Sequence, residues 1–381
     1  MKFFLKDNVL EAAIKRINWL FDEFDNVIVD FSGGKDSTVT LNLALQVAEE
    51  RGRLPVKVMF LDQEAEWQTV IDYVREVMSD PRVECLWHQI PIKLFNATST
   101  AEEWLICWDP DRPGDWMREK EPNSVHDNVL GTDRFAKAFK AHTKSLWPDQ
   151  PAVRLAGVRA SESTARMNGL TAYPTYKGRT WGKKSNPKLG HFDMYPLYDW
   201  TDSDIWKAIH DHGWPYCRIY DYQYQHGISF RDMRVSNLTH ETAVRNLRYM
   251  QEVEPGTWDK LTRRLSGINS AKHTGETLTV PKKLPRAFSS WKEYRDYLLP
   301  RMIADPAHQA TLRKQFDNMD AQYMQDIHEK LHKLPVACIL VNDYHGTKMS
   351  TFHASFSQYS KNKGANDGWT GNAHRTTQAA G

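Results

Sequence analysis

A loop of small and charged residues follows the first apolar run of the chain and is the strongest candidate for chemistry. Two glycines let its backbone approach a ligand closely and expose successive N–H groups, and the helical pattern that follows adds the positive end of a helix dipole. Lys35 adds a positive charge, and Asp36 is placed to reach a magnesium ion or a water bound to a phosphate. These features predict an anion-binding loop, although the Walker spacing G-x-x-x-x-G-K-[ST] does not fit. The loop reads Ser32-Gly33-Gly34-Lys35-Asp36-Ser37-Thr38, in which three hydroxyls are further donors.

Two further groups of polar residues follow later apolar runs. Asp62 comes directly after the run 56–61, and Gly157 and Arg159 lie at the end of the run 153–158. Because ligands of open parallel sheets bind at the carboxyl ends of the strands, we expect these residues to face the loop. Arginine presents a planar fork of donors to phosphate or sulfate oxygens, which makes Arg159 and Arg166 candidate ligand-binding residues. For Arg166 the alternative is a surface ion pair with Glu162, four residues before it.

The surrounding pattern predicts an α/β fold, a parallel twisted sheet with helices on both faces. Apolar runs alternate with helical periodicity, which favours right-handed crossovers between parallel strands. The region 100–150 is rich in Trp, Asp and Pro and is interpreted as an irregular insertion over the site. From about 240 to 334 we expect helices with breaks at several prolines, Pro300 included. The expected strands are 27–31, 56–61, 84–90 and 153–158, and the expected helices in the same part are 8–24, 37–50, 67–78 and 201–212.

The phosphate loop resembles the signature of the PP-loop ATP pyrophosphatases, and the chain resembles their phosphoadenosine phosphosulfate (PAPS) reductase-like family. The further motifs are Leu61-Asp62-Gln63-Glu64, the segment from Gly157 to Arg166, and the segment from Pro196 to Trp206. This resemblance spans roughly residues 20–230 and implies the adenine nucleotide alpha hydrolase-like fold. It also implies ATP and Mg2+ as ligands, with Asp36 as the metal-binding residue and Lys35, Asp36 and Arg159 as catalytic residues. The implied nucleotide-binding residues are Ser32, Gly33, Gly34, Lys35, Asp36, Ser37, Thr38, Asp62, Gly157, Arg159 and Arg166.

The intact loop favours cleavage of ATP to AMP and pyrophosphate, with adenylylation of an acceptor oxygen in sulfur or nucleic-acid modification metabolism. Sulfate, a carboxylate and a base carbonyl are all compatible acceptors. The alternative is a PAPS or adenylylsulfate reductase, but those families carry a cysteine in a Glu-Cys-Gly-Leu-His motif or iron–sulfur cysteine pairs. Neither is present here, and Cys338 lies in an apolar run that would raise its pKa. The chain also resembles the immunoglobulin-binding regulator A type subgroup, which implies a ParB-like partner and, as a third hypothesis, a nucleotide-binding regulator or DNA-associated module.

Charge and composition limit the partners and the compartment. The 381 residues carry a net charge of only +2, but eleven Lys or Arg and two acids lie between 137 and 188. That basic stretch suits an anionic ligand, either nucleic acid or a phosphate-bearing substrate. The sequence predicts no membrane-spanning helix and no signal peptide, so we expect a cytoplasmic protein. The expected domains are 1–235 for nucleotide binding, 236–353 as a helical part and 354–381 as a polar, flexible tail.

Overall fold

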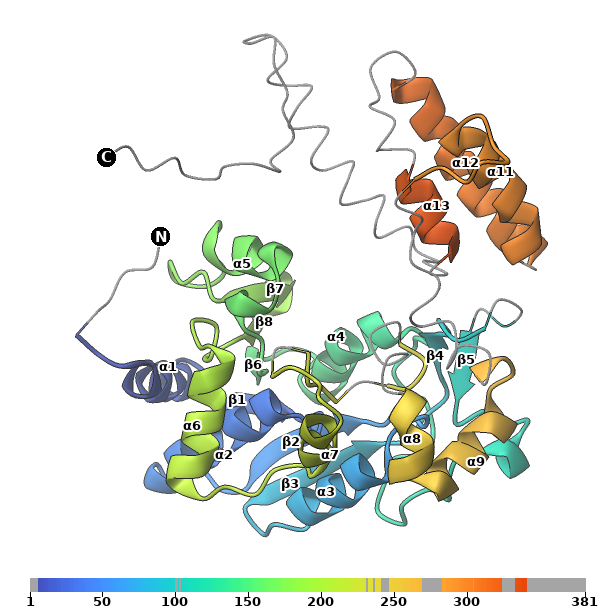
Figure 1. Ribbon diagram of the computed structural model, residues 1–381. Coiled ribbons are helices and arrows are strands. Elements are labelled where there is room, and N and C mark those ends of the chain that lie inside the picture. Colours follow the sequence, from blue (N-terminus) through green and yellow to red (C-terminus); the bar gives the residue numbers. More distant parts are fainter. Residues whose placement is uncertain are drawn as a thin grey trace, which may run out of the picture. The chain divides into compact units, whose positions relative to one another are not determined.

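The computed structural model describes most of the chain as two compact units that divide between residues 275 and 276. The first unit is built on a six-stranded sheet in the order β3-β2-β1-β6-β8-β7 (Figure 1). All neighbouring strands are parallel except β7 and β8, which are antiparallel. The strands are β1 (Asn26–Asp30), β2 (Val56–Leu61), β3 (Val83–His88), β6 (Ala152–Leu155), β7 (Gly182–Asn186) and β8 (His191–Met194). The described residues are 6–99, 102, 104–230, 232–235, 237–240, 247–268, 283–303, 305–323 and 333–340.

Helices cover both faces of the sheet, which confirms the predicted fold class. The crossovers from β1 to β2 and from β2 to β3 lead toward the β3 edge of the sheet, whereas the connection from β3 to β6 leads back across the sheet to the other side of β1. Right-handed connections therefore place α2 and α3 on one face and α4 on the opposite face (Figure 1). The helix α2 also packs against α1 and α6. These helices are α1 (Val9–Glu23), α2 (Lys35–Glu50), α3 (Gln68–Met78), α4 (Phe135–Leu146) and α6 (Asp202–His212).

Side-chain caps fix the ends of two of these helices. Asn8 and Glu11 form a capping box at the start of α1. Thr201 and Asp204 form another at the start of α6, and Gly213 ends that helix in the left-handed conformation. In contrast, the N-cap residue of α2 is Gly34, which has no side chain to accept a hydrogen bond. The Lys35 N–H donates instead to the Tyr220 hydroxyl at 2.9 Å.

The prediction that residues 100–150 are irregular is wrong in part. The segment contains α4 and the strand β5 (Trp104–Cys107), which forms an antiparallel pair with β4 (Ile92–Phe95). Helical periodicity is present at Phe135, Ala138, Phe139 and His142, but the high content of Trp, Asp and Pro around it hides the signal. The helix contacts the buried side chain of Arg154 on β6, which donates to the Thr143 hydroxyl at 2.9 Å.

The first unit extends beyond the boundary expected at 235/236. The helices α8 (Leu247–Val253) and α9 (Pro255–Arg264) bury Leu247, Met250 and Leu261 in the same core as the sheet. Glu254 accepts hydrogen bonds from the backbone N–H groups of Gln68 and Thr69, at 2.7 and 2.8 Å, and so caps α3 from a distance of 185 residues along the chain. The first compact unit consequently ends at residue 275, later than the boundary at 235 that the change in sequence pattern predicts.

The described part of the second unit contains three helices around a small apolar core. Arg295 is buried there and forms a bidentate ion pair with Asp320 at 2.9 and 3.0 Å. The predicted break at Pro300 is wrong, since α11 continues to Met302 with this proline inside its last turn. The helices are α11 (Trp291–Met302), α12 (Pro306–Tyr323) and α13 (Lys333–Leu340), and the expected tail 354–381 lies outside the described residues. Within the described part of the chain, no helix is long and apolar enough to cross a membrane.

Candidate functional site

The phosphate loop lies at the point where the strand order reverses. The first connection leaves β1 toward β2, whereas β6 is the neighbour of β1 on the other side. Loops at such a switch point diverge and leave a crevice at the carboxyl ends of the strands. Gly33 has φ +71°, a left-handed conformation that side chains rarely adopt. The loop is held by the Ser37 hydroxyl, which accepts from the Ser32 N–H at 3.2 Å and donates to the Gly34 carbonyl at 2.9 Å.

Gly157 brings the end of β6 against the first turn of α2. A Cβ at this position would lie 2.5 Å from the carbonyl carbon of Asp36 and 2.8 Å from the backbone nitrogen of Ser37. Only glycine allows this approach without displacing backbone. The predicted role of Gly157 as a residue without bulk at the strand end therefore has a geometric basis, and the position aligns two predicted site segments.

Two cations and two carboxylates form a compact cluster at the start of α2. The Lys35 ammonium lies 3.4 Å from Asp36 Oδ2 and 3.6 Å from Asp202 Oδ1. Arg159 pairs with Asp36 and, at 2.8 Å, with Asp202. Both basic side chains are more than nine-tenths buried. Burial alone would lower the pKa of Arg159, but the charges of Asp36 and Asp202 outweigh it and hold that pKa above its ordinary value.

Asp202 is the residue of this cluster that the sequence interpretation missed. It follows the N-cap of α6 and lies in the first turn of that helix. Its Oδ1 also faces Lys35 and Arg159. No local signal separates these two roles, because an acid at a helix start is favoured by the dipole in any case. Only the packing of α6 against α2 reveals the second role.

Arg166 lies on a separate helix, α5 (Thr164–Thr171), near the edge of the site. Its guanidinium pairs with Glu162 through Nη1, as the alternative interpretation expected, and about half of its side chain is exposed. Burial lowers its pKa, and the positive charge of Arg234 lowers it further. Arg166 is therefore a partly paired cation with a second arginine as its neighbour.

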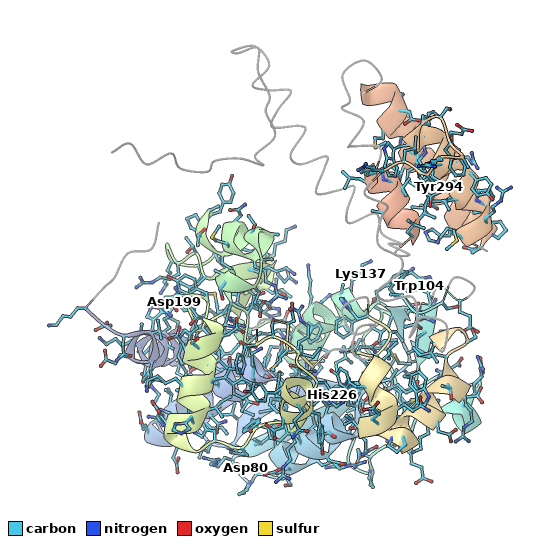
Figure 2. The ribbon with its side chains drawn as sticks, viewed as in Figure 1. Asp80, Trp104, Lys137, Asp199, His226 and Tyr294 are labelled. Carbon is cyan, nitrogen blue, oxygen red and sulfur yellow. The ribbon has the colours of Figure 1, made fainter. Side chains whose placement is uncertain are left out.

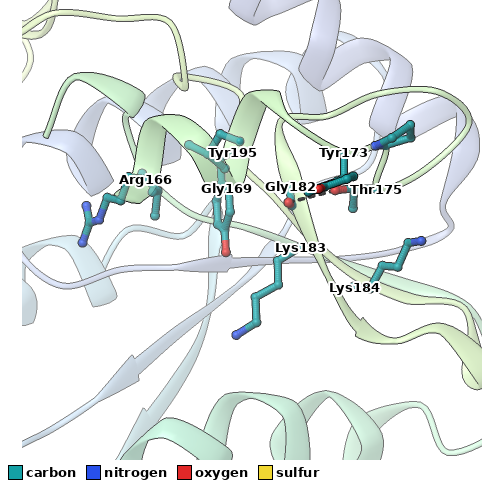
Figure 3. Close-up of a pocket in the computed structure, with 11 residues that line it drawn as sticks. Arg166, Gly169, Tyr173, Thr175, Gly182, Lys183, Lys184 and Tyr195 are labelled. Atoms are coloured by element: carbon teal, nitrogen blue, oxygen red, sulfur yellow. Dashed lines mark hydrogen bonds between the residues drawn. The ribbon is translucent and has the colours of Figure 1, made fainter. Parts of the chain in front are cut away.

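A basic pocket of about 560 Å³ adjoins this part of the site (Figure 3). Arg166 lines one side, and Lys183 and Lys184 line another from β7, with Tyr173 and Tyr195 between them. The pocket belongs to the predicted basic stretch 137–188. The basic residues of that stretch do not all lie on one surface. Arg154 is buried, and its guanidinium donates a hydrogen bond to the Thr143 hydroxyl on α4 at 2.9 Å.

The structure places Asp62 in a buried network rather than beside the loop. Its carboxylate accepts from Trp87 Nε1 at 2.9 Å, from Gln89 Nε2 at 3.0 Å and from Arg118. Every hydrogen-bond partner described for it lies outside residues 32–38. The side chain is fully buried. The expectation that Asp62 faces the loop is therefore not met by its contacts, and its role in nucleotide binding stays a prediction.

The neighbouring acids of the same motif are also buried. Glu64 accepts from Arg264 at 2.6 and 3.1 Å and from the Trp108 N–H at 2.6 Å. Burial, reinforced by the charge of Asp62, raises the pKa of Glu66 to about 8. Arg264 is 200 residues away in sequence, so no local pattern announces this pair.

No described cysteine has the surroundings of a reactive thiolate. Burial raises the pKa of Cys217 to about 12, and burial together with nearby acids raises that of Cys107 well above its ordinary value. Cys85 is only half-buried, yet its pKa is also raised. Cys338 is buried in the core of the second unit. A nucleophilic thiol instead needs positive charge and access to solvent.

The site residues fit a magnesium ion that is held mainly by phosphates. Mg2+ commonly uses one or two carboxylates together with substrate oxygens. Asp36 at the start of α2 and Asp202 at the start of α6 supply two carboxylates, which are bridged by Arg159. Among the described residues, no group of three or more His, Cys, Asp or Glu forms a site that could hold a metal without such help.

Comparisons with known proteins separate the chain into two regions. The phosphoadenosine phosphosulfate reductase domain matches residues 26–226, and a domain of unknown function, DUF3440, matches residues 227–324. The uncharacterized protein YbdN of Escherichia coli K12 is 29% identical over 315 residues, which cover 77% of this chain and 75% of that protein. Sulfate adenylyltransferase subunit 2 of Pseudomonas putida GB-1 is 25% identical over 224 residues, 55% of this chain and just under two thirds (65%) of that protein. A PAPS reductase from Candida auris, solved with phosphate, aligns with TM-score 0.34 and 14% identity over 58% of this chain and 93% of its own.

Proposed function

Since the chain belongs to the phosphoadenosine phosphosulfate reductase domain family, we propose that it binds ATP with magnesium and transfers the adenylyl group to an acceptor oxygen. The observation that carries this proposal is the glycine N-cap at the start of α2, with Lys35 and Arg159 beside it at the switch point of the sheet. The positive end of the α2 dipole and two buried cations suit a chain of phosphates. The likeness to a sulfate adenylyltransferase subunit supports the same class of reaction.

In the proposed reaction, an acceptor oxygen attacks the α-phosphorus of ATP. The bond from that phosphorus to the bridging oxygen of the β-phosphate breaks, and its electron pair leaves with pyrophosphate. The loop amides and Lys35 hold phosphate oxygens, and Arg159 offsets the negative charge that builds up on them. Asp36 and Asp202 keep both cations in place. A bound magnesium ion would further neutralise the phosphates.

The main alternative, a reductase of a sulfonucleotide, requires a thiol that accepts the sulfonyl group. Burial raises the pKa values of Cys85, Cys107 and Cys217, and Cys338 is buried in the core of the second unit. A regulator that binds nucleotide without turnover, with a ParB-like partner or nucleic acid, is the other alternative. Both alternatives predict no release of pyrophosphate from ATP.

The test is incubation of the purified protein with α-labelled ATP and magnesium, with and without sulfate or DNA. We expect AMP-containing product and pyrophosphate, stimulated by the true acceptor. Lys35→Ala and Asp36→Ala should each lose at least about 10-fold in ATP affinity or turnover. Lys15→Ala is the matched control, because this lysine is exposed on α1 and pairs only with Asp7 in the described structure.

Unchanged ATP affinity in both loop variants would contradict the assignment of the loop. Binding without turnover under all additions would favour the regulator. Binding of PAPS but not of ATP would favour the reductase, and substitution of each cysteine in turn would then identify its thiol.

A further inference from the structure

A short segment that follows the reductase domain lies directly on the phosphate loop. We define this crossing segment as residues 232–235 and 237–239, all within the region matched by the domain of unknown function. The Lys35 ammonium donates to the Met233 carbonyl at 3.1 Å. A Cβ on Gly34 would lie 2.9 Å from the Val235 side chain. The crossing segment therefore forms a wall of the site.

Further along, the crossing segment is fixed to the end of β2. The Leu238 N–H donates to the Ala65 carbonyl at 2.9 Å, and the Asn237 side chain donates to the Gln63 carbonyl at 3.3 Å. The segment thus spans the carboxyl ends of two neighbouring strands, β1 and β2. A contact at each end of the segment makes it a built part of the fold rather than a free strand of chain.

Arg234 is the residue of this segment whose side chain is available. Its backbone is held on both sides, because its N–H donates to Gln223 Oε1 at 3.1 Å and its carbonyl accepts from Gln223 Nε2 at 2.9 Å. Gln223 itself is fully buried. The Arg234 side chain is exposed, and no ion pair joins it to any residue that the structure describes. The backbone of Arg234 is therefore fixed, while the positive charge of its side chain has no ion-pair partner among the described residues.

Arg166 adjoins the same cluster, because its partner Glu162 also lies 3.9 Å from Arg159 Nη2. Burial, and then the positive charge of Arg234, lower the pKa of Arg166. Glu162 pairs with Nη1 of Arg166, and about half of the Arg166 side chain is exposed and can meet another acceptor. Two guanidinium groups held near each other repel, and a doubly charged anion between them relieves the repulsion. Planar donor forks match the oxygens of a tetrahedral anion. The two candidate anion-binding side chains are thus Arg166 on α5 and Arg234 on the crossing segment.

We propose that Arg166 and Arg234 together bind a tetrahedral oxyanion, a phosphate or a sulfate group, at the mouth of the phosphate loop. The proposal rests on the proposed function, in that the anion belongs either to the nucleotide or to its acceptor. It assigns to the region of unknown function a direct part in substrate binding. The site of the reductase domain is then incomplete without the first residues of the region that follows it.

The test measures binding of pyrophosphate, sulfate and ATP to the full chain by titration calorimetry. We expect Arg234→Gln to weaken binding of the clamped anion by about 10- to 100-fold, as for the loss of a charge-assisted bidentate contact. Arg234→Lys keeps the positive charge but lacks the planar pair of donors, so its anion affinity should lie between those of the wild type and Arg234→Gln. Arg263→Gln is the control, since this arginine is exposed on α9 and pairs with Asp259.

The three ligands distinguish the sources of the anion. Weaker binding of pyrophosphate and ATP alone identifies a nucleotide phosphate, and weaker binding of sulfate alone identifies an acceptor. If Arg234→Gln binds all three ligands as the wild type does, the clamp is refuted while ATP turnover by the wild type would still uphold the proposed function. If the wild type binds the anions through Arg234 but not ATP, the clamp stands and the proposed function fails.

Discussion

Replacing Gly157 with alanine perturbs the phosphate loop through backbone contact alone. The added Cβ would lie 2.5 Å from the Asp36 carbonyl carbon, against about 3.4 Å for the closest ordinary contact. The neighbour is the first turn of α2 and not a flexible side chain, so the two backbones must separate by about 0.9 Å. This displacement moves the start of α2, with the amides and the Asp36 carboxylate, away from Arg159.

Two different magnitudes follow from that displacement. Overpacking of this size typically costs about 1–3 kcal/mol of unfolding free energy. A misplacement near 1 Å in a binding constellation costs roughly 100-fold in activity, because hydrogen bonds to the transition state are lost. We therefore expect Gly157→Ala to keep the fold with moderate destabilisation and to lose ATP turnover almost completely.

The assay pairs urea unfolding with ATP affinity and pyrophosphate release on the same preparation. Gly256→Ala is the matched control, because nothing lies within 4 Å of a Cβ there and the position is in the first turn of α9. That control should stabilise the protein slightly or leave it unchanged. Normal ATP affinity in a folded Gly157→Ala variant would refute the argument that β6 positions the loop.

Three further substitutions test the charges of the site and its support. Arg264→Leu leaves the fully buried Glu64 without its partner and should cost about 3–5 kcal/mol of unfolding free energy by urea titration, whereas adding Glu64→Gln should recover part of that loss. Burial raises the pKa of Glu66 to about 8, so the folded state loses stability as the pH rises from about 4.5 toward 8. Glu66→Gln should remove up to about 5 kcal/mol of that loss. Identical pH profiles of unfolding free energy for the two proteins would contradict the raised pKa. Arg159→Ala should weaken ATP binding at least about 10-fold, and a lower melting temperature with normal affinity would show a structural role only.

The sequence predicts the sheet and the loop well because their signals are local. Apolar runs specify β1 and β2 to within a residue, and the capping residues Asn8 and Thr201 mark two helix starts. Gly157 and Arg159 come to the loop as expected, since parallel strands end at the same edge of a sheet.

The remaining features depend on residues far apart in the chain. Asp62 follows a strand as a ligand-binding acid would, yet its bonds go to Trp87 and Arg118, and nothing near Asp62 in sequence specifies that choice. Arg264 meets Glu64 from 200 positions away. Arg234 has no motif around it, and only the fold shows that it lies between two contacts with the loop.

Residues between 232 and 264 complete contacts of the reductase domain, so they determine where the chain can be divided into fragments or recombined with a relative. A fragment cut at 226, where the match to the reductase domain ends, would lack the carboxylate that caps α3, the cation that neutralises Glu64 and the carbonyl that holds Lys35. Such a fragment should fold poorly and bind little nucleotide. A chimera of two relatives joined at that point should be poorly tolerated, because these contacts would then join residues of different parents. The two matched regions are therefore best treated as one unit of exchange, whose natural cut lies beyond residue 268.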